Sequence, residues 1–356
     1  MERNNTPYSQ LKIFYHQETL QHLLQGERCN PLYVRIKPTN RCNHNCGYCH
    51  YRNAYLDLDQ YDPNDEIPRK KMMQIVQDMS AMGVKAVTFS GGGEPLVYPY
   101  IEETMESILE HDIDLSIITN GSLLNGNKAR ILADAKWVRI SIESCNDTAY
   151  CKTRGLKEGA FFSLCTNIEN FAKIKSKNCE LGINVVVTNE NYKEVREIAV
   201  LMKNLGVNHV KYAPLCTQET WKYHEGFKNR VSYDLKKVQE ELADENFRII
   251  DLYTGDFADS VIFERQYNKC PIKEFVCVIG ANAKVYYCHD KAYLSDGMVC
   301  DLKDRSFQEA WNSADVCAKF ENFDAKECCK QHCVYDSRNQ LINSFLDMDR
   351  NHVNFV

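Results

Sequence analysis

The chain has 356 residues, of which 44% are apolar and 26% charged, the balance of an ordinary globular protein rather than of a disordered or collagenous chain. Its 43 basic and 49 acidic residues give a net charge of −6, so nothing in the charge indicates a nucleic-acid or membrane-surface protein, whose surface would be basic. The N-terminus has no apolar signal-peptide core, and no apolar run is long enough to cross a membrane. We therefore expect a cytoplasmic protein without a nucleic-acid or membrane partner.

Predicted helices and strands alternate along most of the chain. Apolar residues recur at helical spacing over residues 9–26, and residues 32–36 alternate like a strand. The further predicted strands lie at 84–89, 115–119, 137–142, 182–187 and 209–212, and the further predicted helices lie at 69–82, 100–111 and 192–205. Alternation with helices of this length implies parallel strands joined by right-handed crossovers.

Six such strands precede residue 215, two fewer than in a closed barrel of this kind. We therefore expect an α/β fold with an open, partial (β/α)6 barrel, whose reactive site lies at the carboxyl ends of the strands. Residues 217–245 are predicted to be helical, and the rest is Cys-rich and irregular until a final helix near 337–348. The expected parts are a helical segment at 1–30, the barrel at 31–230 and a C-terminal α+β extension at 231–356.

Cysteine is the outlier of the composition, with 17 residues. Disulfide scaffolds rich in cysteine are short and secreted, whereas this chain is long and lacks a signal peptide. In a reducing compartment, clustered thiols are more often metal ligands. Two groups stand out, a tight one at 42–49 and a looser one at 270–333.

The first group directly follows the first predicted strand and has the spacing C-x3-C-x2-C, formed by Cys42, Cys46 and Cys49. Three thiolates in one loop can bind three corners of a cubane iron–sulfur cluster and leave one iron open. An open position is what distinguishes a reactive metal centre from a structural one. The alternatives are three buried thiols or a structural zinc loop, with His44 or His50 as the fourth ligand.

This loop, placed after the first strand of a repeating β/α chain, resembles that of the radical S-adenosylmethionine superfamily. The resemblance implies a catalytic [4Fe–4S] cluster whose open iron binds S-adenosylmethionine. Electron transfer then cleaves the cofactor to a 5′-deoxyadenosyl radical, which removes a hydrogen atom from the substrate. It also implies that Tyr48, between the last two cysteines, lies beside the adenine.

Further parts of the family pattern follow later strands. The segment 90–95 reads Ser-Gly-Gly-Gly-Glu-Pro and resembles the glycine-rich stretch that contacts the methionyl amino group. Glycines allow close backbone approach, and a Glu accepts from an ammonium. The residues that the resemblance assigns to the cofactor are Tyr48, Gly91, Gly92, Gly93, Glu94, Asn120, Ser141 and Arg154. For Arg154, which would neutralise the cofactor carboxylate, a plain surface arginine is the alternative.

The second group resembles the SPASM/twitch extension, which binds auxiliary iron–sulfur clusters. Residues 275–279 and 284–288 read as a β-hairpin, although Asn282-Ala283 stands where the family has an Asp-Gly turn. Because one cluster needs four thiolates, we expect an auxiliary [4Fe–4S] cluster with the ligands Cys270, Cys288, Cys329 and Cys333. Cys277, otherwise a packed core thiol, and Cys328 compete for places in this set. A zinc-binding or merely Cys-rich cap is the alternative.

The resemblance implies a radical S-adenosylmethionine oxidoreductase or epimerase that abstracts hydrogen from a small molecule, such as a carbohydrate, with flavodoxin or ferredoxin as electron donor. The roughly 30 residues before the first strand are too few for a leader-recognition fold, which favours a small molecule over a peptide. The first alternative is a maturase that modifies a peptide or protein. The alternative outside enzymes is an iron–sulfur electron carrier or scaffold, although a carrier has no need of a glycine-rich cofactor loop.

One lone cysteine is a candidate catalytic residue. Cys145 comes just past the fourth predicted strand, on the rim where this architecture gathers reactive groups. A thiol gives up its hydrogen atom readily, so Cys145 could terminate an epimerisation by donating to a carbon radical. Cys216, after the sixth strand, is a weaker candidate. Against both stands the general tendency of a lone cysteine to be a small packed hydrophobe.

Overall fold

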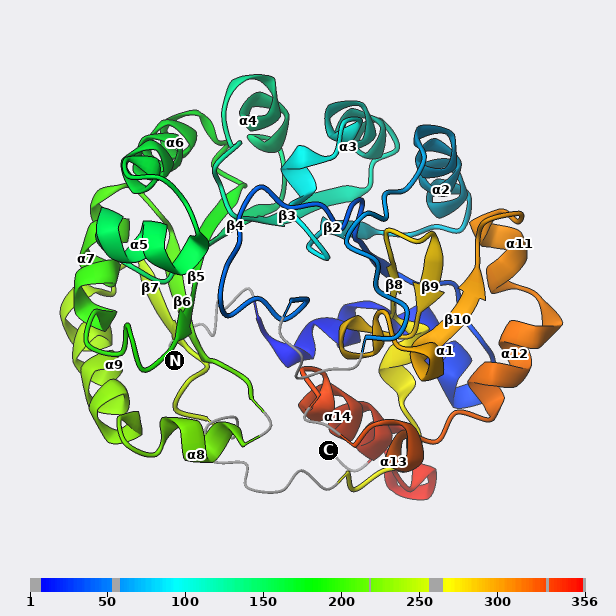
Figure 1. Cartoon of the computed structure of the whole chain (residues 1–356). Helices are drawn as coiled ribbons and strands as arrows, with labels where there is room; N and C mark the ends of the chain where they lie inside the picture. The colour runs from blue at the N-terminus through cyan, green and yellow to red at the C-terminus, as the bar shows by residue number, and fades with distance from the viewer. Residues whose placement is uncertain (1–7, 53–57, 218, 256–264, 331–332, 355–356) are drawn as a thin grey trace.

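The fold is one continuous, curved β-sheet with helices around its outer face (Figure 1). The computed structural model describes residues 8–52, 58–217, 219–255, 265–330 and 333–354. Residues 1–7 of the expected helical segment and several short stretches of the other two expected parts lie outside these ranges. Within the described ranges, no helix is long and apolar enough to cross a membrane.

The sheet has ten strands. They are β1 (Tyr33–Ile36), β2 (Ala86–Phe89), β3 (Asp114–Thr119), β4 (Trp137–Ser141), β5 (Glu180–Val187), β6 (His209–Pro214), β7 (Arg248–Asp251), β8 (Val276–Ile279), β9 (Lys284–Tyr286) and β10 (Met298–Asp301). Strands β1 to β7 pair in chain order and in parallel. The expected partial barrel is confirmed, with β7 as a parallel strand beyond the six predicted.

The C-terminal extension is built onto the same sheet. β8 pairs in parallel with the free edge of β1, with Tyr33 opposite Val276 and Ile36 opposite Ile279. β9 and β10 continue from β8 in antiparallel fashion, so the predicted hairpin is present as β8–β9. The full order is therefore β10-β9-β8-β1-β2-β3-β4-β5-β6-β7, and the extension is an edge of the barrel sheet.

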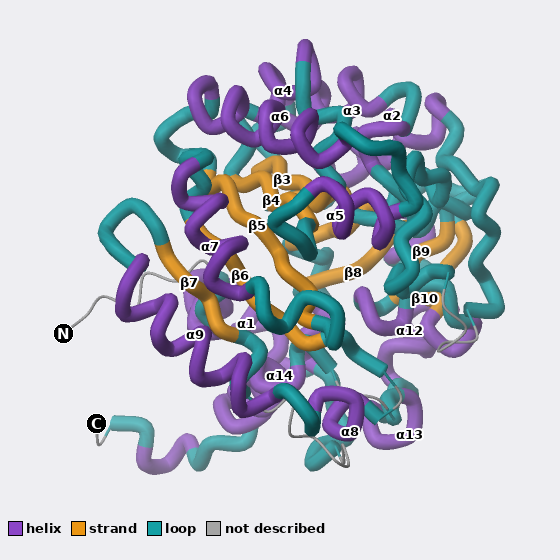
Figure 2. The backbone as a smooth tube through the Cα atoms, turned by 60° about the vertical axis from the view of Figure 1, so that its left-hand side comes forward, coloured by secondary structure: helices purple, strands orange, loops and turns teal. Residues whose placement is uncertain are grey.

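The helices of the barrel lie outside the strands, as the turned view of Figure 2 shows. The described α-helices are α1 (Gln17–Gln25), α2 (Arg69–Ala81), α3 (Ile101–Glu110), α4 (Gly126–Leu132), α5 (Asp147–Arg154), α6 (Ala160–Ile174), α7 (Val195–Asn204), α8 (Thr220–His224), α9 (Lys228–Leu242), α11 (Phe307–Trp311), α12 (Ala314–Glu321), α13 (Ala325–Cys328) and α14 (Asp336–Leu346). The predicted 9–26 helix is split at His16, where a 3₁₀ turn over Gln10–Tyr15 precedes α1.

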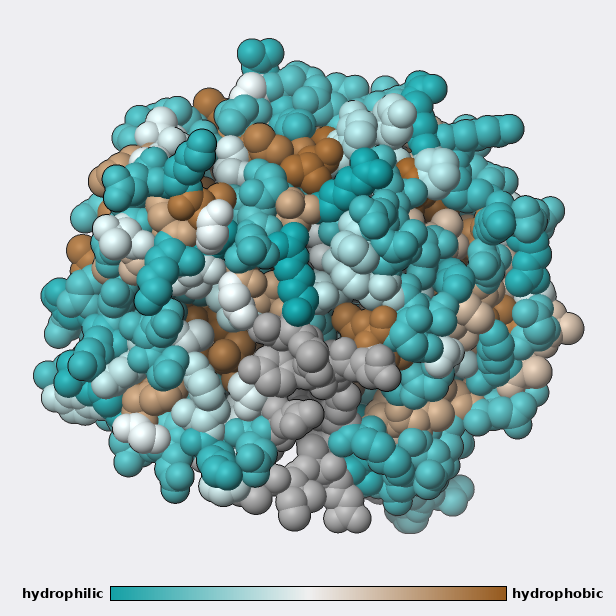
Figure 3. Space-filling view, viewed as in Figure 1, coloured by the Kyte–Doolittle hydropathy of each residue, from teal (hydrophilic) through white to brown (hydrophobic). Residues whose placement is uncertain are grey.

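Strand residues alternate between an apolar outer face and a polar inner face. On β1, for example, Val34 and Ile36 are fully buried in the core under the helices, whereas Arg35 and Lys37 belong to the inner face. Removing side chains such as Val34 and Ile36 from water contributes about 1.5–3 kcal/mol each. On the side of the molecule seen in Figure 3, hydrophilic residues predominate and apolar ones form small, separate patches.

Candidate active site

The cysteine loop leaves β1 at the carboxyl end of the sheet. Cys42, Cys46 and Cys49 are all half-buried in it, and the loop closes on itself where the Cys49 amide donates to the Cys46 carbonyl at 3.2 Å. At its entrance, Lys37 is buried, and its Nζ donates to the Gly91 carbonyl at 2.5 Å and to the Tyr51 hydroxyl. These contacts join the start of the loop to the glycine-rich segment after β2.

The glycine-rich segment packs backbone to backbone against the cysteine loop. The Gly93 amide donates to the Thr39 carbonyl at 3.0 Å, and the Glu94 amide donates to the Arg41 carbonyl at 2.9 Å. A Cβ on Gly93 would lie 2.0 Å from the Arg41 carbonyl oxygen, so a side chain there is excluded by main-chain atoms that have no room to move. The glycine requirement at this position therefore comes from contact between the two loops.

Glu94 ties the end of β2 to the end of β3. Its carboxylate is buried and accepts hydrogen bonds from the Thr119 hydroxyl at 2.6 Å, the Asn120 amide at 2.7 Å and the Leu96 amide at 3.0 Å. Burial raises the pKa of Glu94, while these three donors favour its charged form. The protein itself thus supplies three donors to the carboxylate predicted to face the cofactor.

Asn120 links the end of β3 to the cysteine loop. Its Nδ2 donates to Asn43 Oδ1 at 2.8 Å, and its Oδ1 accepts from the amide and hydroxyl of Ser122. Asn43 in turn donates to the Ser122 hydroxyl at 2.9 Å. Because Asn43 lies between the first two cysteines, this small network sets the position of that part of the loop.

Arg154, the last residue of α5, is fully buried and is no surface arginine. Its Nη2 forms an ion pair with Glu143 at 2.5 Å and donates to the Ser141 carbonyl at 2.7 Å, which ties α5 to the end of β4. The Asn45 amide of the cysteine loop donates to the Arg154 carbonyl at 2.9 Å. The loop therefore caps the C-terminal end of α5, where carbonyls lack helical partners.

Two thiols of the cysteine loop have raised pKa values. Burial raises the pKa of Cys42 to about 11, and burial also raises the pKa of Cys46, although Arg154 opposes the shift. Burial likewise holds the pKa of Tyr48 well above its usual range. Because a thiol must lose its proton to bind iron, ligand binding at this loop releases protons.

The residues around the loop have groups that fit a bound cofactor. Ser90 Oγ, Glu143 Oε1 and Arg154 Nε are buried side-chain atoms without a hydrogen-bond partner among the described residues. Together they offer acceptors for an ammonium and a donor for a carboxylate, beside three thiols that can bind three irons. Ser141, at the end of β4, places its carbonyl against Arg154.

The geometry also bears on the zinc alternative. His44 Nδ1 lies 3.3 Å from Arg154 Nη1, and burial together with Arg154 lowers the pKa of His44 to about 4. The ring of His50 contacts that of Tyr51 edge to face. Within the described ranges, no three His, Cys, Asp or Glu side chains converge on a point where they would hold one metal ion. Thiolates of a cluster each bind a different iron and so need no such common point.

The second cysteine group lies beside the start of β1. Cys270, Cys288 and Cys333 all pack against one apolar cluster that includes Phe275 and Ile342. The pKa of Cys288 is held well above its usual range by burial, with further contributions from Asp290, Cys333, Cys270 and Cys329. The four cysteines predicted as auxiliary ligands are therefore neighbours in space.

The two competing cysteines differ from each other in their surroundings. Cys277 is fully buried on the outer face of β8, where its neighbour is Cys300. Cys328, in α13, lies close enough to Tyr287 to raise the pKa of that phenol, after the larger effect of burial. Neither residue, and likewise not Cys329, belongs to the apolar cluster that contacts Cys270, Cys288 and Cys333. Cys328 lies beside Cys329 and helps to raise its pKa, so Cys328 and Cys329 stay alternatives for one ligand.

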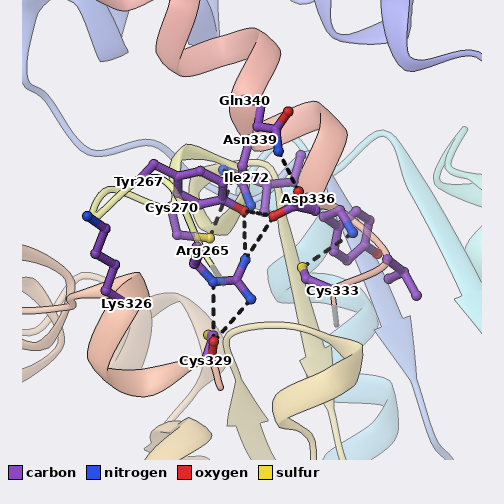
Figure 4. A network of polar contacts seen from close by, with 12 residues as sticks. Arg265, Tyr267, Cys270, Ile272, Lys326, Cys329, Cys333, Asp336, Asn339 and Gln340 are labelled. Atoms are coloured by element: carbon purple, nitrogen blue, oxygen red, sulfur yellow. Dashed lines mark hydrogen bonds and ion pairs between the residues drawn. The ribbon is translucent and has the colours of Figure 1, made fainter. Parts of the chain in front are cut away.

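A polar network supports this cysteine group (Figure 4). Arg265 donates from Nε and Nη2 to the Cys329 carbonyl, both at 3.3 Å, and its Nη1 pairs with Asp336 at 3.2 Å. Asn339 Oδ1 accepts from Cys270 Sγ at 3.6 Å and from the Ile272 amide at 3.0 Å. Sequence reasoning missed Arg265 and Asn339 because no spacing rule relates them to the cysteines.

The two candidate hydrogen donors differ in their surroundings. Cys145 packs against the outer core, and its Sγ donates to Glu194 Oε2 at 3.4 Å, at the start of α7. Burial and Glu194 raise the pKa of this thiol to about 12. Cys216 is exposed after β6. Neither contacts the cysteine loop through a hydrogen bond among the described residues.

Comparisons with known proteins concern the family and the fold of the chain. Residues 36–202 match the family described as the Radical SAM superfamily. The chain is 28% identical over 222 residues to a probable GTP 3′,8-cyclase of Methanocaldococcus jannaschii, covering 61% of this chain and 68% of that one. It is 29% identical over 160 residues to an S-adenosylmethionine-dependent nucleotide dehydratase of Lacinutrix mariniflava, covering 43% of this chain and only 32% of that one.

Among solved structures, the chain resembles Streptococcus suis SuiB bound to the precursor peptide SuiA, with a TM-score of 0.64 and 17% identity, over 98% of this chain and 80% of that one. A likeness at this identity concerns the fold, which here includes the C-terminal extension. The radical SAM family uses a [4Fe–4S] cluster and S-adenosylmethionine, and 17 cysteines are enough for an auxiliary cluster as well.

Proposed function

Because the chain carries a radical S-adenosylmethionine domain over residues 36–202, we propose that it is an enzyme that abstracts a hydrogen atom from a small-molecule substrate. In this proposal Cys42, Cys46 and Cys49 bind three irons of a [4Fe–4S] cluster. When bound, the cluster and S-adenosylmethionine supply the electron and the cleavable sulfonium from which the hydrogen-abstracting radical comes. The observation that carries the proposal is the tight linkage of the cysteine loop to the ends of β2, β3 and β4.

The chain's own residues have the task of binding and orienting. Gly92 and Gly93 bring the backbone after β2 against Asn40 and Arg41, and Gly91 makes a tight turn with Gly93. We assign the cofactor's methionyl end to the segment of these three glycines. The partnerless Ser90 Oγ and Glu143 Oε1 would accept from its ammonium, and Arg154 would hold its carboxylate. Tyr48 would contact the adenine. Glu94 and Asn120 would hold the two loops in register, since their polar groups already join them.

The second cysteine group is proposed to hold an auxiliary cluster. Its ligands would be Cys270, Cys288, Cys329 and Cys333, whose clustering around Arg265 and Asn339 supports the assignment. When bound, this cluster supplies an electron acceptor for an oxidation. Arg265 would offset part of the negative charge of four thiolates. Flavodoxin or ferredoxin is the proposed electron donor, and the cytoplasm is the proposed location.

A small molecule is favoured over a peptide, and an enzyme over an electron carrier. Two relatives are named for reactions on nucleotides, although the match spans only 68% and 32% of their lengths. A carrier would have no need for the linked glycine-rich segment, whose role in this proposal is to bind the methionyl end. We propose oxidation or epimerisation as the reaction.

The first test is anaerobic reconstitution with iron and sulfide. The wild type should bind about eight irons per chain, as two four-iron clusters, and should form 5′-deoxyadenosine with dithionite. Replacing Cys42, Cys46 and Cys49 together by Ala should leave about four irons and abolish cofactor cleavage.

A matched control is available for that triple variant. Cys29, Cys165 and Cys317 are half-buried like the loop cysteines but are not among the seven proposed cluster ligands, so their triple Ala variant should keep about eight irons and full cleavage. Cofactor cleavage that survives without Cys42, Cys46 and Cys49 would refute the proposal. For the auxiliary site, the Cys288→Ala variant should bind less iron than the wild type, and the Cys277→Ala variant should bind as much. The opposite result would replace Cys288 by Cys277 in the proposed ligand set.

The reaction type has its own test, with the true substrate in heavy water. In an epimerisation ended by Cys145, the thiol S–H bond breaks and its hydrogen atom, exchanged for solvent deuterium, forms the new bond to carbon. The thiyl radical left on Cys145 would take one electron from the proposed flavodoxin or ferredoxin donor and one proton from solvent, which restores the thiol. The Cys145→Ala variant should then lose deuterium incorporation while still cleaving the cofactor. A product that is two electrons oxidised and gains no deuterium would eliminate the epimerase assignment and favour oxidation.

A further inference from the structure

Four basic side chains come from three strands onto the inner face of the sheet. Arg35 and Lys37 lie on and just after β1, Arg139 lies on β4 and Lys211 on β6. Their chain neighbours Val34, Ile36, Val138, Ile140, Val210 and Tyr212 are buried in the outer core. Strand alternation therefore puts all four cations on the opposite, inner face.

Three of these cations lack a salt-bridge partner in the part of the chain that the structure describes, although Asp290 acts on Arg35 from a distance. Among the described residues, Arg35, Arg139 and Lys211 form no ion pair. The Nε atoms of Arg35 and Arg139 are buried and have no hydrogen-bond acceptor. The contacts that they do make are with neutral aromatic residues: Arg139 Nη1 lies 3.5 Å from the Tyr8 hydroxyl, and Lys211 Nζ lies 5.6 Å from the Tyr8 ring.

Elsewhere this chain pairs its buried guanidinium groups. Arg154 pairs with Glu143, and Arg265 pairs with Asp336. At the starts of β7 and β5, Arg248 forms an ion pair with Glu180. A charge that is partly removed from water without a partner is costly. Arg35, Arg139 and Lys211 are half-buried, so three such charges gathered in one place are unlike the buried pairs above and need an explanation.

The cations also repel one another. The pKa of Lys211 is held well below its usual range by burial first, and then by Arg139 and Arg35. Burial and Arg35 act in the same direction on Lys37. The nearby acid is Asp290, whose carboxylate also accepts from the Val334 amide at 3.2 Å. Asp290 therefore acts on Arg35 and Lys37, at the β1 side of the group.

We propose that Arg35, Arg139 and Lys211 form a binding site for the anionic end of the substrate, namely a phosphate or a chain of phosphates. Guanidinium groups suit phosphate oxygens because their N–H donors match them in pairs, and a lysine adds a point charge. S-adenosylmethionine cannot fill this role, since it brings one carboxylate together with a positive ammonium and a positive sulfonium. Assigning this anion to the substrate rests on the proposed function, but the site itself can be tested without turnover.

The probe is inorganic pyrophosphate, titrated into the reconstituted protein by calorimetry at constant ionic strength. Arg139→Gln and Lys211→Met should each weaken pyrophosphate binding at least fivefold, and the double variant at least twentyfold. The control variants Arg196→Gln and Lys237→Met change exposed residues on α7 and α9 and should stay within twofold of the wild type. Because the two inner-face variants remove unpaired charges, their melting temperatures should equal or exceed that of the wild type.

Several outcomes would overturn the inference. They are absence of pyrophosphate binding, equal loss in the inner-face and control variants, or inner-face variants that weaken S-adenosylmethionine binding while leaving pyrophosphate binding unchanged. The last result would mean that these cations serve the cofactor carboxylate. Cofactor cleavage is measured separately, so its absence in a protein that binds pyrophosphate as expected would refute the proposed function and leave the anion site standing.

Discussion

Replacing Arg154 by Met should destabilise the metal-free protein by about 3–5 kcal/mol, the cost of removing one partner from a buried ion pair. The change leaves the Glu143 carboxylate buried at 5% exposure without its 2.5 Å partner. It also removes the donor to the Ser141 carbonyl. Since a domain's whole stability is about 5–15 kcal/mol, urea unfolding of the reduced protein followed by circular dichroism will measure the loss easily.

Two further variants separate the ion pair from general damage to α5. Arg69→Met breaks an exposed pair with Glu103, with side chains 59% and 40% exposed, and should cost much less stability than Arg154→Met because solvent screens the pair. The double variant Arg154→Met/Glu143→Gln should be at least about 1 kcal/mol more stable than the two single losses added together, because it leaves no unpaired charge. An Arg154→Met variant no less stable than Arg69→Met would refute this account of how the end of β4 is joined to the cysteine loop.

Three more outcomes follow from the site and the hairpin. The Glu94 carboxylate accepts hydrogen bonds from three donors, and Glu94→Gln would place an amide NH2 against at least one of them. The change should lower the free energy of unfolding in urea by about 1.5–3 kcal/mol. A loss below about 0.5 kcal/mol would contradict the role of this network. Ala283, in the β8–β9 turn, has a φ of 55°, so Ala283→Gly should stabilise the protein by about 0.5–1 kcal/mol, read as a higher melting temperature; no rise would argue against strain at this turn. The pKa of His44 is about 4 in the folded protein and about 6.5 in the unfolded chain, so the unfolded chain binds the proton first. Stability therefore falls as the pH drops from about 6.5 to about 4, by at most about 3.5 kcal/mol. His44→Gln should flatten that part of the pH profile, and an unchanged slope would assign the effect to other residues.

The parts of the fold that were predictable are those with a local pattern. Strands β1 to β6 bury alternate residues under helices, so the period-two pattern in the sequence locates them. β7 is only four residues long and follows a polar helix, so its Arg-Ile-Ile-Asp gave too little pattern to detect. Helix α6 had a usable signal in Phe161, Leu164, Ile168 and Phe171, which share one buried face.

The sequence predicted those parts of the site whose residues lie close together in the chain, as in the two cysteine groups. The supporting contacts of the site were not predictable, because they join residues far apart in the chain. Arg154 acts on residues of the cysteine loop more than 100 positions earlier, and Arg265 reaches the Cys329 carbonyl 64 positions later. The unpaired cations of the inner face depend likewise on three separate strands meeting, which no single segment reveals.

The pairing of β8 with β1 has a consequence for synthesis on the ribosome. β1 receives its first neighbour, β2, after about 50 further residues, but the strand that covers its other edge is made roughly 240 residues later. At translation rates of about 5–20 residues per second, that edge waits about 10–50 seconds. An open strand edge is a template for pairing with other chains, so the nascent protein passes through a period in which it depends on chaperones or on slow local folding to stay monomeric.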